Sequence, residues 1–299
     1  MTVMEVGTGK HVYSLSGEWA RLPAGIGFGR VSDIGVDSQD RVYVFQRSDP
    51  PVLVFDREGT YLNSWGNGAF LYPHGFHIAN DIVYLTDRDS SVCIMYTLDG
   101  KPIQMLGKHK VTSDTGAEGF PAPVPRVAGP FNQATDIVPA PWGDLYVTDG
   151  HRNARVHRFD SGGHLLQSWG TWGKTEPGQF DVPHSLCVGR DGRIYVVDKE
   201  NYRIQVFTAN GEFQAMWTDM RRPNDIALTP EGDFVVCEGV VEGYTPRISI
   251  FDQEGNVLAR WETVASEGLG VDSRGDIYLS RIGHHNQGIE GVDKYVRQR

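Results

Sequence analysis

The sequence lacks two features that would point to large partners, a long apolar run and an excess of basic residues. Among its 299 residues, 38 are acidic and 28 are basic, so the formal net charge is −10. A protein that grips nucleic acid needs a basic surface to displace the counterions of the phosphates, so nucleic acid is excluded as an expected partner. A membrane-spanning helix needs about 20 successive apolar residues. No run approaches that length, and we expect no membrane partner.

Cysteine is scarce, and no leader sequence is visible. The three cysteines, Cys93, Cys187 and Cys237, fall within predicted strands, and their spacing is not that of metal-binding pairs. Reduced and buried thiols are typical of a cytoplasmic protein. Residues 1–10 lack the cationic start and the apolar core of a signal peptide. We therefore predict a cytoplasmic location, while a secreted chain that had lost its signal would show the same pattern.

What the sequence does contain is a block of four strands that recurs six times. The fourth block shows it most plainly, with alternating apolar and polar residues at 184–188, 193–198, 202–207 and 212–217. Alternation broken by Asp-Gly and Asn-Gly turns predicts hairpin-linked antiparallel strands. The other copies cover 33–65, 74–107, 135–169, 224–261 and 267–299. A period of roughly 35 to 60 residues built from strands alone predicts an all-β, six-bladed β-propeller.

The last block lacks a fourth strand, and the start of the chain offers one. Residues 10–15 resemble the missing outer strand, so we predict that the N-terminal strand pairs with the last blade and closes the ring. A closed propeller is one unit, which predicts a single domain over residues 1–299. The stretch 108–130 holds four prolines and is too long for a hairpin turn. A lid over one face and a homo-oligomer contact are both open roles for it.

The residue that opens each block draws attention to the ring centre, because the first strand of every blade lines the central channel. Those residues are, in order, Ser32, His74, Thr135, His184, Asn224 and Glu267. His74 and His184 share one repeat position, and each follows a proline. Imidazoles brought together in this way suit zinc or another divalent ion. The alternative is structural, with Pro-His serving only as a good entry to a tight inner strand.

Carboxylates and one arginine extend this constellation. Asp33, Asp136 and Asp225 stand one position after the opening residue and suit calcium, or else accept backbone N–H bonds between blades. Arg47 follows a second strand and is expected to hold a carboxylate in a two-pronged contact, which predicts a small, anionic substrate. Residues 283–286, with two histidines, form either a second cluster or an exposed turn.

Two stretches carry a family resemblance. They are Pro177–Leu186 followed by Asp198–Phe207, and Phe131–Val138 followed by Val147–Arg155. Over nearly its whole length the chain resembles the NHL-type six-bladed propellers, and within them the peptidyl-α-hydroxyglycine α-amidating lyases. The resemblance implies that His74 and His184 bind zinc and that Arg47 faces the substrate. It also implies a calcium ion held by the Asp225 carboxylate and the backbone carbonyls of Val31 and Phe76.

The chain departs from the family pattern at two positions. The family's third zinc histidine falls on Asn224, and its catalytic tyrosine falls on His151. Asparagine is a weak zinc ligand unless another group such as His151 completes the site. A histidine in place of the tyrosine is suited to act as a general base near neutral pH. In the family the zinc and a tyrosinate assist the loss of a hemiaminal proton, and an aldehyde and an amide leave.

Three functions are therefore open. The first is a metal-dependent lyase or hydrolase in which His74 and His184 hold the ion, Asn224 or water completes its coordination, His151 moves a proton and Arg47 anchors the substrate. The second is a calcium-dependent lactonase-type hydrolase that uses Glu267, Asn224 and Asp225. The third is a non-catalytic NHL interaction platform. Such platforms are usually attached to other modules and are often basic, so the sequence favours an enzyme.

Overall fold

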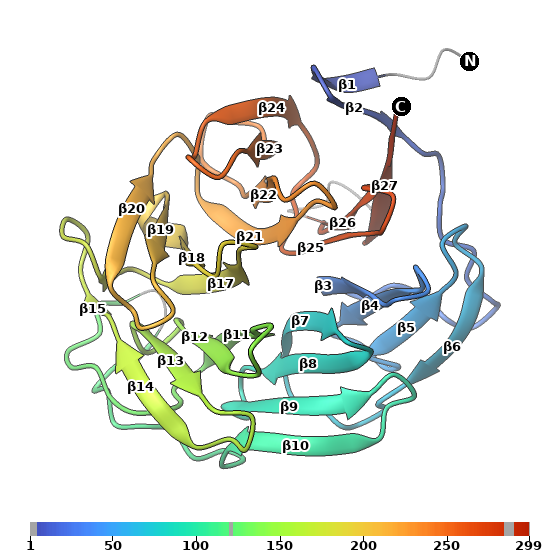
Figure 1. The fold of residues 1–299 in the computed structure, drawn as a ribbon. Helices are drawn as coiled ribbons and strands as arrows, with labels where there is room; N and C mark the ends of the chain where they lie inside the picture. Colours follow the sequence, from blue (N-terminus) through green and yellow to red (C-terminus); the bar gives the residue numbers. More distant parts are fainter. Residues whose placement is uncertain (1–4, 120–121, 284–289, 299) are drawn as a thin grey trace. The chain divides into compact units, whose positions relative to one another are not determined.

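The computed structural model describes residues 5–119, 122–283 and 290–298, and these residues are almost entirely strand and turn (Figure 1). The one helical element among them is a short 3₁₀ turn, η1 (Lys199–Asn201). Strands form six antiparallel sheets of the propeller-blade type and one two-stranded parallel ribbon. The predicted fold class, an all-β six-bladed β-propeller, is confirmed. No helix in the described part of the chain is long and apolar enough to cross a membrane.

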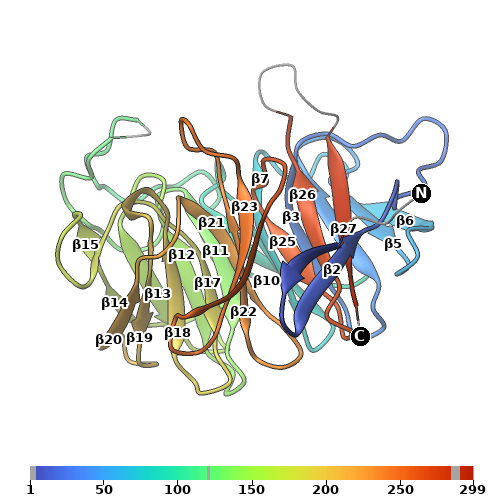
Figure 2. The same cartoon turned by 90° about the horizontal axis from the view of Figure 1, so that it is seen from above.

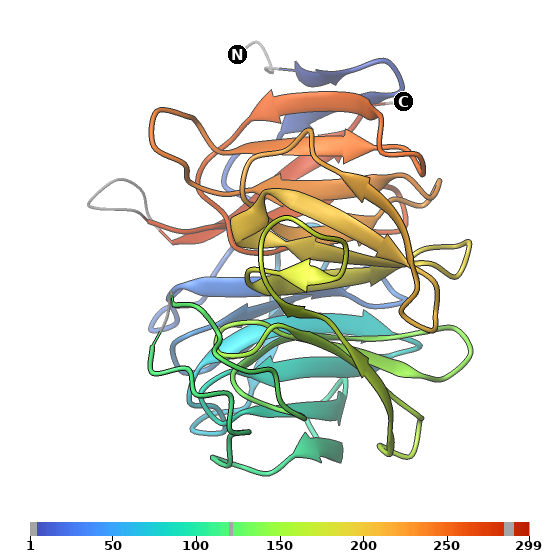
Figure 3. The ribbon, with the colours of Figure 1, turned by 90° about the vertical axis from the view of Figure 1, so that its left-hand side faces the viewer.

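The chain groups into two compact units, residues 70–223 and residues 1–69 with 224–299. Its organisation as a single domain stays a prediction. In the 70–223 unit the strands follow one another in three four-stranded meanders (Figure 3). These are β7 (Pro73–Ala79), β8 (Ile82–Asp87), β9 (Val92–Thr97) and β10 (Pro102–Gly107); β11 (Ala134–Pro139), β12 (Leu145–Asp149), β13 (Arg155–Phe159) and β14 (Leu165–Trp169); and β17 (Pro183–Val188), β18 (Ile194–Asp198), β19 (Arg203–Phe207) and β20 (Phe213–Trp217). The parallel ribbon pairs β15 (Thr171–Trp172) with β16 (Gln179–Phe180).

The other unit also holds three sheets. Two are four-stranded meanders: β3 (Val31–Val36), β4 (Val42–Gln46), β5 (Val52–Phe55) and β6 (Tyr61–Trp65); and β21 (Pro223–Leu228), β22 (Phe234–Glu238), β23 (Arg247–Phe251) and β24 (Val257–Glu262). The third has five strands in the order β1 (Glu5–Thr8), β2 (His11–Leu15), β27 (Gly291–Arg297), β26 (Ile277–Arg281) and β25 (Leu269–Val271).

The predicted closure is confirmed by the five-stranded sheet, in which the two ends of the chain meet. Strand β2 pairs antiparallel with β27, with Tyr13 opposite Arg297 and Leu15 opposite Tyr295 (Figure 2). Tyr13 is fully buried, and its ring centroid lies 5.2 Å from that of Trp261. An aromatic pair at this spacing contributes about 0.5–1.5 kcal/mol beyond the burial of its area. Strand β1, which the sequence did not indicate, folds back on β2 and forms the edge of the sheet.

A β-bulge stands at the start of the first strand in several blades, at the repeat position that the sequence singled out. In β17, Pro183 pairs with Asp198 and Ser185 with Val197, so His184 has no partner of its own in the ladder. The register of β7 shifts in the same way between Pro73 and Phe76. Bulges bend a strand and re-aim the extra side chain, and they often border functional sites. The repeat therefore places each of these histidines on a bulge.

Between the sheets of the 70–223 unit lie cores of aliphatic and aromatic side chains. Phe207 is one centre of contact, with the rings of Trp169 and Phe180 each 5.9 Å away. The end of β18 is held by polar contacts to the connection that precedes its own blade. Arg203 donates through Nε to Asp198 Oδ2 at 2.7 Å and through Nη2 to the Gln179 carbonyl at 2.6 Å. Asp198 and Arg203 thus link the end of β18 to the parallel ribbon that precedes β17.

Candidate metal centre

Three buried histidines come together in the 70–223 unit. His74 lies in β7, His184 in β17 and His151 in the turn after β12, and their exposed fractions are 5%, 4% and 7%. One ring nitrogen from each lies within 4.8 Å of the other two. The ring centroids of His74 and His184 are 4.8 Å apart, and those of His74 and His151 are 4.9 Å apart. Three imidazoles at this spacing form a set that could hold a metal ion.

Local backbone geometry positions the three rings. The bulges in β7 and β17 carry His74 and His184. His151 is brought close by Gly150, because a Cβ at that position would lie 2.1 Å from the Pro183 carbonyl oxygen. Only glycine lets the turn after β12 approach the start of β17 so closely. The turn therefore places His151 beside the strand that carries His184.

Hydrogen bonds fix the orientation of the first ring. His74 Nδ1 lies 2.8 Å from the Thr135 carbonyl oxygen and donates its proton there. The same oxygen accepts a bond from the Thr86 hydroxyl at 2.8 Å. Nε2 of His74 consequently carries the lone pair, and it lies 2.9 Å from His151 Nε2. A carbonyl behind the distal nitrogen is the usual support of a metal-binding histidine.

The electrostatics favour neutral imidazoles. Burial, together with the charges of His74, His184, Lys199 and Arg88, holds the pKa of His151 well below its ordinary value. At neutral pH its ring therefore keeps a lone pair for a cation. Lys199 is itself buried, and its Nζ lies 3.2 Å from His184 Nε2.

The donor set passes a simple test of fit for zinc. Zinc binds neutral imidazole nitrogens at about 2.0–2.1 Å, which places two ligand nitrogens of a tetrahedral site about 3.4 Å apart. The nitrogens of His74 and His151 lie 2.9 Å apart, and the ligand nitrogens of His74, His151 and His184 all lie within 4.8 Å of one another. Small ring movements would bring all three to coordination distance. Three protein ligands also leave a fourth position for water or substrate, as in catalytic zinc sites.

The long connection between β10 and β11 supports the turn that carries His151; its green trace is visible in Figure 3. The Thr115 hydroxyl, which is fully buried, donates to the Arg152 carbonyl at 2.6 Å. The Arg152 N–H in turn donates to the Asn132 carbonyl at 3.2 Å, and the His151 N–H donates to the Gln133 carbonyl at 3.4 Å. This segment, for which the sequence left a lid and an oligomer contact open, therefore packs against the backbone of the candidate site.

Two other predicted site residues, Arg47 and Asn224, belong to the second compact unit, residues 1–69 with 224–299. Arg47 forms an ion pair with Glu267, whose other oxygen lies 3.1 Å from Nη2 of Arg30. Asn224 is buried and donates through Nδ2 to the Ser266 carbonyl at 2.7 Å. Arg47 thus has a carboxylate partner within the chain, and its role toward a substrate stays a prediction.

The hydrogen bonds of Asp225 and Asp136 match the structural alternative for these aspartates. Asp225 accepts the Ile226 N–H and the Leu269 N–H, both at 2.8 Å. Asp136 accepts the Ile137 N–H at 2.8 Å and the Ser185 hydroxyl at 3.1 Å. Each carboxylate therefore connects its own strand to the first strand of the next blade in sequence.

The calcium site implied by the resemblance stays a prediction. Val31 and Asp225 lie in one compact unit and Phe76 in the other, and all three are buried. Of the histidine run at 283–286, only Gly283 falls within the described residues.

Sequence reasoning missed two cations near the histidines. Lys199 and Arg88 each follow the last residue of a second strand, which is the repeat position that Arg47 also occupies. The signal was present in the sequence, since three of the six blocks carry a basic residue there. Arg88 donates through Nε to Asp89 Oδ1 at 2.8 Å, and its guanidinium carbon lies 3.5 Å from the centroid of the Tyr72 ring.

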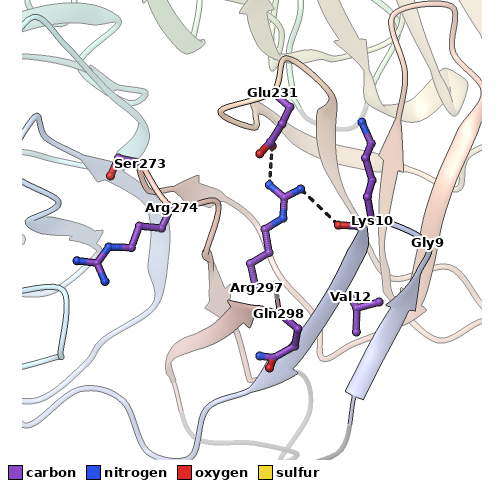
Figure 4. Close-up of a pocket in the computed structure, with 8 residues that line it drawn as sticks. All are labelled: Gly9, Lys10, Val12, Glu231, Ser273, Arg274, Arg297 and Gln298. Carbon is purple, nitrogen blue, oxygen red and sulfur yellow. Dashed lines mark hydrogen bonds and ion pairs between the residues drawn. The ribbon is translucent and has the colours of Figure 1, made fainter.

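A separate pocket of about 620 Å³ opens in the unit that contains both chain ends (Figure 4). Arg297 crosses it, with Nη1 donating to Glu231 at 2.5 Å and Nη2 to the Lys10 carbonyl at 3.3 Å. None of the residues that the sequence predicted for the site lines this pocket.

Comparison with known proteins agrees with the repeat found in the sequence. The NHL repeat model matches residues 180–207, a range that includes His184 and Lys199. The chain carries an NHL repeat. It is 29% identical to NHL repeat-containing protein 3 of Homo sapiens, covering 97% of this chain and 85% of that protein. It is 28% identical to a probable peptidyl-α-hydroxyglycine α-amidating lyase of Caenorhabditis elegans, covering 60% of this chain and 56% of the lyase.

Solved structures add a likeness of fold. A gluconolactonase from Xanthomonas campestris matches with a TM-score of 0.68, covering 98% of this chain and 94% of that one, at 13% sequence identity. At that identity the likeness shows the fold alone. The resemblance to NHL-repeat proteins and to the amidating lyases, first stated from the sequence, is confirmed by the relatives. These relatives include enzymes, while the name of NHL repeat-containing protein 3 states no activity.

Proposed function

We propose that the chain is a zinc-dependent lyase that cleaves the C–N bond of a small, anionic hemiaminal. The observation that carries this proposal is the buried cluster of His74, His151 and His184, with ligand nitrogens within 4.8 Å of one another. These three side chains would hold the ion. His151 then takes the coordinating role that the family resemblance assigned to the position of Asn224. The similarity to α-amidating lyases supports the reaction class.

A bound zinc ion supplies a Lewis acid that lowers the pKa of a substrate hydroxyl. The remaining tasks belong to the chain. The carbonyl of Thr135 orients His74 through its Nδ1 proton, at 2.8 Å. Burial excludes water from the rings, which strengthens every charge interaction at the site. Lys199 brings an ammonium group to 3.2 Å from His184 Nε2, where it can stabilise negative charge that develops on the substrate.

The balance of the reaction is simple. The hydroxyl of the hemiaminal loses its proton, its C–O bond becomes a carbonyl, the C–N bond breaks, and the departing nitrogen gains a proton. An N-acyl-α-hydroxyglycine would give a primary amide and glyoxylate. No oxidant or reductant is consumed, so zinc, which has no redox chemistry, suffices.

The lactonase alternative has less support from the contacts. Glu267 is paired with Arg47 and Arg30, and Asp225 accepts two backbone N–H groups. The fold likeness to a gluconolactonase does not select between these activities. The platform alternative is kept open by the long match to NHL repeat-containing protein 3.

The test combines metal analysis with turnover. Protein purified without added metal is analysed for zinc and calcium, and N-benzoyl-α-hydroxyglycine is supplied as substrate with glyoxylate release as the readout. We expect near-stoichiometric zinc and glyoxylate release, both lost when His74→Ala is combined with His184→Ala. Calcium with hydrolysis of a lactone panel would instead establish the lactonase function. If the protein contains no metal and turns over neither substrate, the interaction platform is the function that remains.

A further inference from the structure

Arg88 occupies the same repeat position as Lys199, whose side chain lies close to His184. In β7 and β8 Pro73 pairs with Asp87, and in β17 and β18 Pro183 pairs with Asp198. Arg88 and Lys199 are the next residues after those aspartates, so each stands at the end of its blade where the histidine bulge lies. In the later blade this position delivers an ammonium group to the neighbouring histidine. The earlier blade delivers a guanidinium to the same end of the sheet.

The Arg88 side chain is held in place on two sides. Nε donates to Asp89 Oδ1 at 2.8 Å, and the guanidinium carbon lies 3.5 Å from the centroid of the Tyr72 ring. The Arg88 N–H also donates to the Tyr72 carbonyl at 3.1 Å. The side chain is 20% exposed, so the guanidinium is largely removed from water yet still reachable. A planar cation stacked on an aromatic ring is pre-organised, and little freedom is lost when it binds a ligand.

Most of the donors of this guanidinium remain available. Its Nε is the one nitrogen that bonds a residue in the described part of the chain, which leaves the two Nη groups with four N–H donors. Parallel N–H bonds from an arginine match the two oxygens of a carboxylate. Tyr72, whose ring the guanidinium faces, lies two residues before His74, so the cation stands beside the start of the strand that carries that histidine. Arg47, by contrast, is already paired with Glu267.

We propose that Arg88 is a specificity-determining residue that binds the carboxylate of the substrate beside the three-histidine centre. The inference rests on the proposed function for the location of the reacting group, and it adds the residue that recognises the anionic group of the substrate. A neutral hemiaminal would leave the Arg88 guanidinium without its carboxylate, so the site selects substrates that carry an anionic group next to the reacting carbon.

Binding of unreactive analogues tests the proposal without turnover. N-benzoylglycine carries the carboxylate, and N-benzoylglycinamide is its neutral counterpart; both are titrated calorimetrically into the zinc-loaded protein. A contact between charged groups is worth about 1.5–3 kcal/mol, or roughly 10- to 100-fold in affinity. We expect Arg88→Gln to weaken binding of the acid by that factor and to leave binding of the amide unchanged. Arg88→Lys should restore part of the affinity, because it keeps the charge but loses the planar fork.

Arg193 offers a matched control in the same unit. Its Nε donates to Asp191 at 2.5 Å, and its guanidinium carbon lies 5.4 Å from the Tyr195 ring centroid, so it has the same two kinds of neighbour. Arg193→Gln should leave both affinities unchanged. Thermal unfolding verifies that each variant is folded, and Arg88→Lys serves if Arg88→Gln does not fold.

The outcomes separate this inference from the proposed reaction. Equal affinity of the wild type for acid and amide, no binding of either, or equal weakening of both by Arg88→Gln would overturn the role of Arg88. Selective loss of acid binding in a protein that releases no glyoxylate would sustain the anion site while refuting the lyase. Glyoxylate release that is insensitive to Arg88→Gln would do the reverse.

Discussion

Replacing His151 by glutamine should weaken zinc binding far more than replacing a histidine outside the cluster. Structural zinc sites with four ligands bind with about 10–16 kcal/mol. Shared equally, that is about 3–4 kcal/mol for each ligand, or a loss of roughly 10²- to 10³-fold in affinity. The equal share is reasonable here, because all three rings are already buried and close together and little ordering remains to offset the gain.

The assay is a competition titration against a chromophoric zinc chelator, with the free energy of unfolding measured in parallel. Zinc at 100 times its Kd should stabilise the folded protein by about 2.7 kcal/mol, and this gain should shrink in the variant. His164→Gln is the control, since that side chain is 82% exposed and pairs with Asp160. An affinity of His151→Gln within threefold of wild type would show that His151 is not a ligand. If His74→Gln and His184→Gln also bound normally, the cluster would not be a metal site.

Three further predictions concern the long connection, the closing strand and a buried histidine in β7. Thr115→Val removes the 2.6 Å hydrogen bond to Arg152 and should weaken zinc binding about 10-fold in the same titration. Thr115→Ser should restore the affinity. Equal affinities of Thr115→Val and wild type would show that the long connection does not support the site. Tyr13→Ala should lower the free energy of unfolding by about 3–5 kcal/mol in denaturant titrations, and a loss under 1 kcal/mol would contradict the closure argument. Burial lowers the pKa of His77 to about 4. Between about pH 6.5 and 4, this histidine is therefore protonated in the unfolded chain and neutral in the folded chain. Wild type should therefore lose on the order of 3 kcal/mol relative to His77→Gln as the pH falls through that window, and parallel curves would refute the shift.

The repeat made the fold and two of the three histidines of the candidate centre predictable. A residue at one repeat position adopts the same local backbone in each blade, so the sequence predicts that His74 and His184 lie close together. The bulge that aims them is a property of the repeat rather than of either blade. Pairing of the N-terminal strand with the last blade followed from the strand that the last block lacked.

The rest of the site depends on geometry that the repeat does not encode. His151 lies in a turn, and its approach to the other rings requires the close packing of Gly150 on Pro183 and the hydrogen bonds of the long connection. Lys199 follows Asp198, which forms a structural contact with Arg203, so its position alone does not mark it as a residue of the site. The structure pairs Arg47 with Glu267 from a distant block, a contact that the repeat does not indicate.

The pairing of β2 with β27 also leaves β2 without its partner strand during most of protein synthesis. Strand β2 leaves the ribosome among the first residues, but its partner begins at Gly291, about 280 residues later. At 5–20 residues per second the early strand waits roughly 15 to 55 s with an open edge. Such an edge is a template for pairing with other chains, so this interval is when a nascent chain would be most exposed to aggregation and to chaperone capture. The blades of residues 70–223, whose strands pair only with near neighbours in sequence, face no such delay.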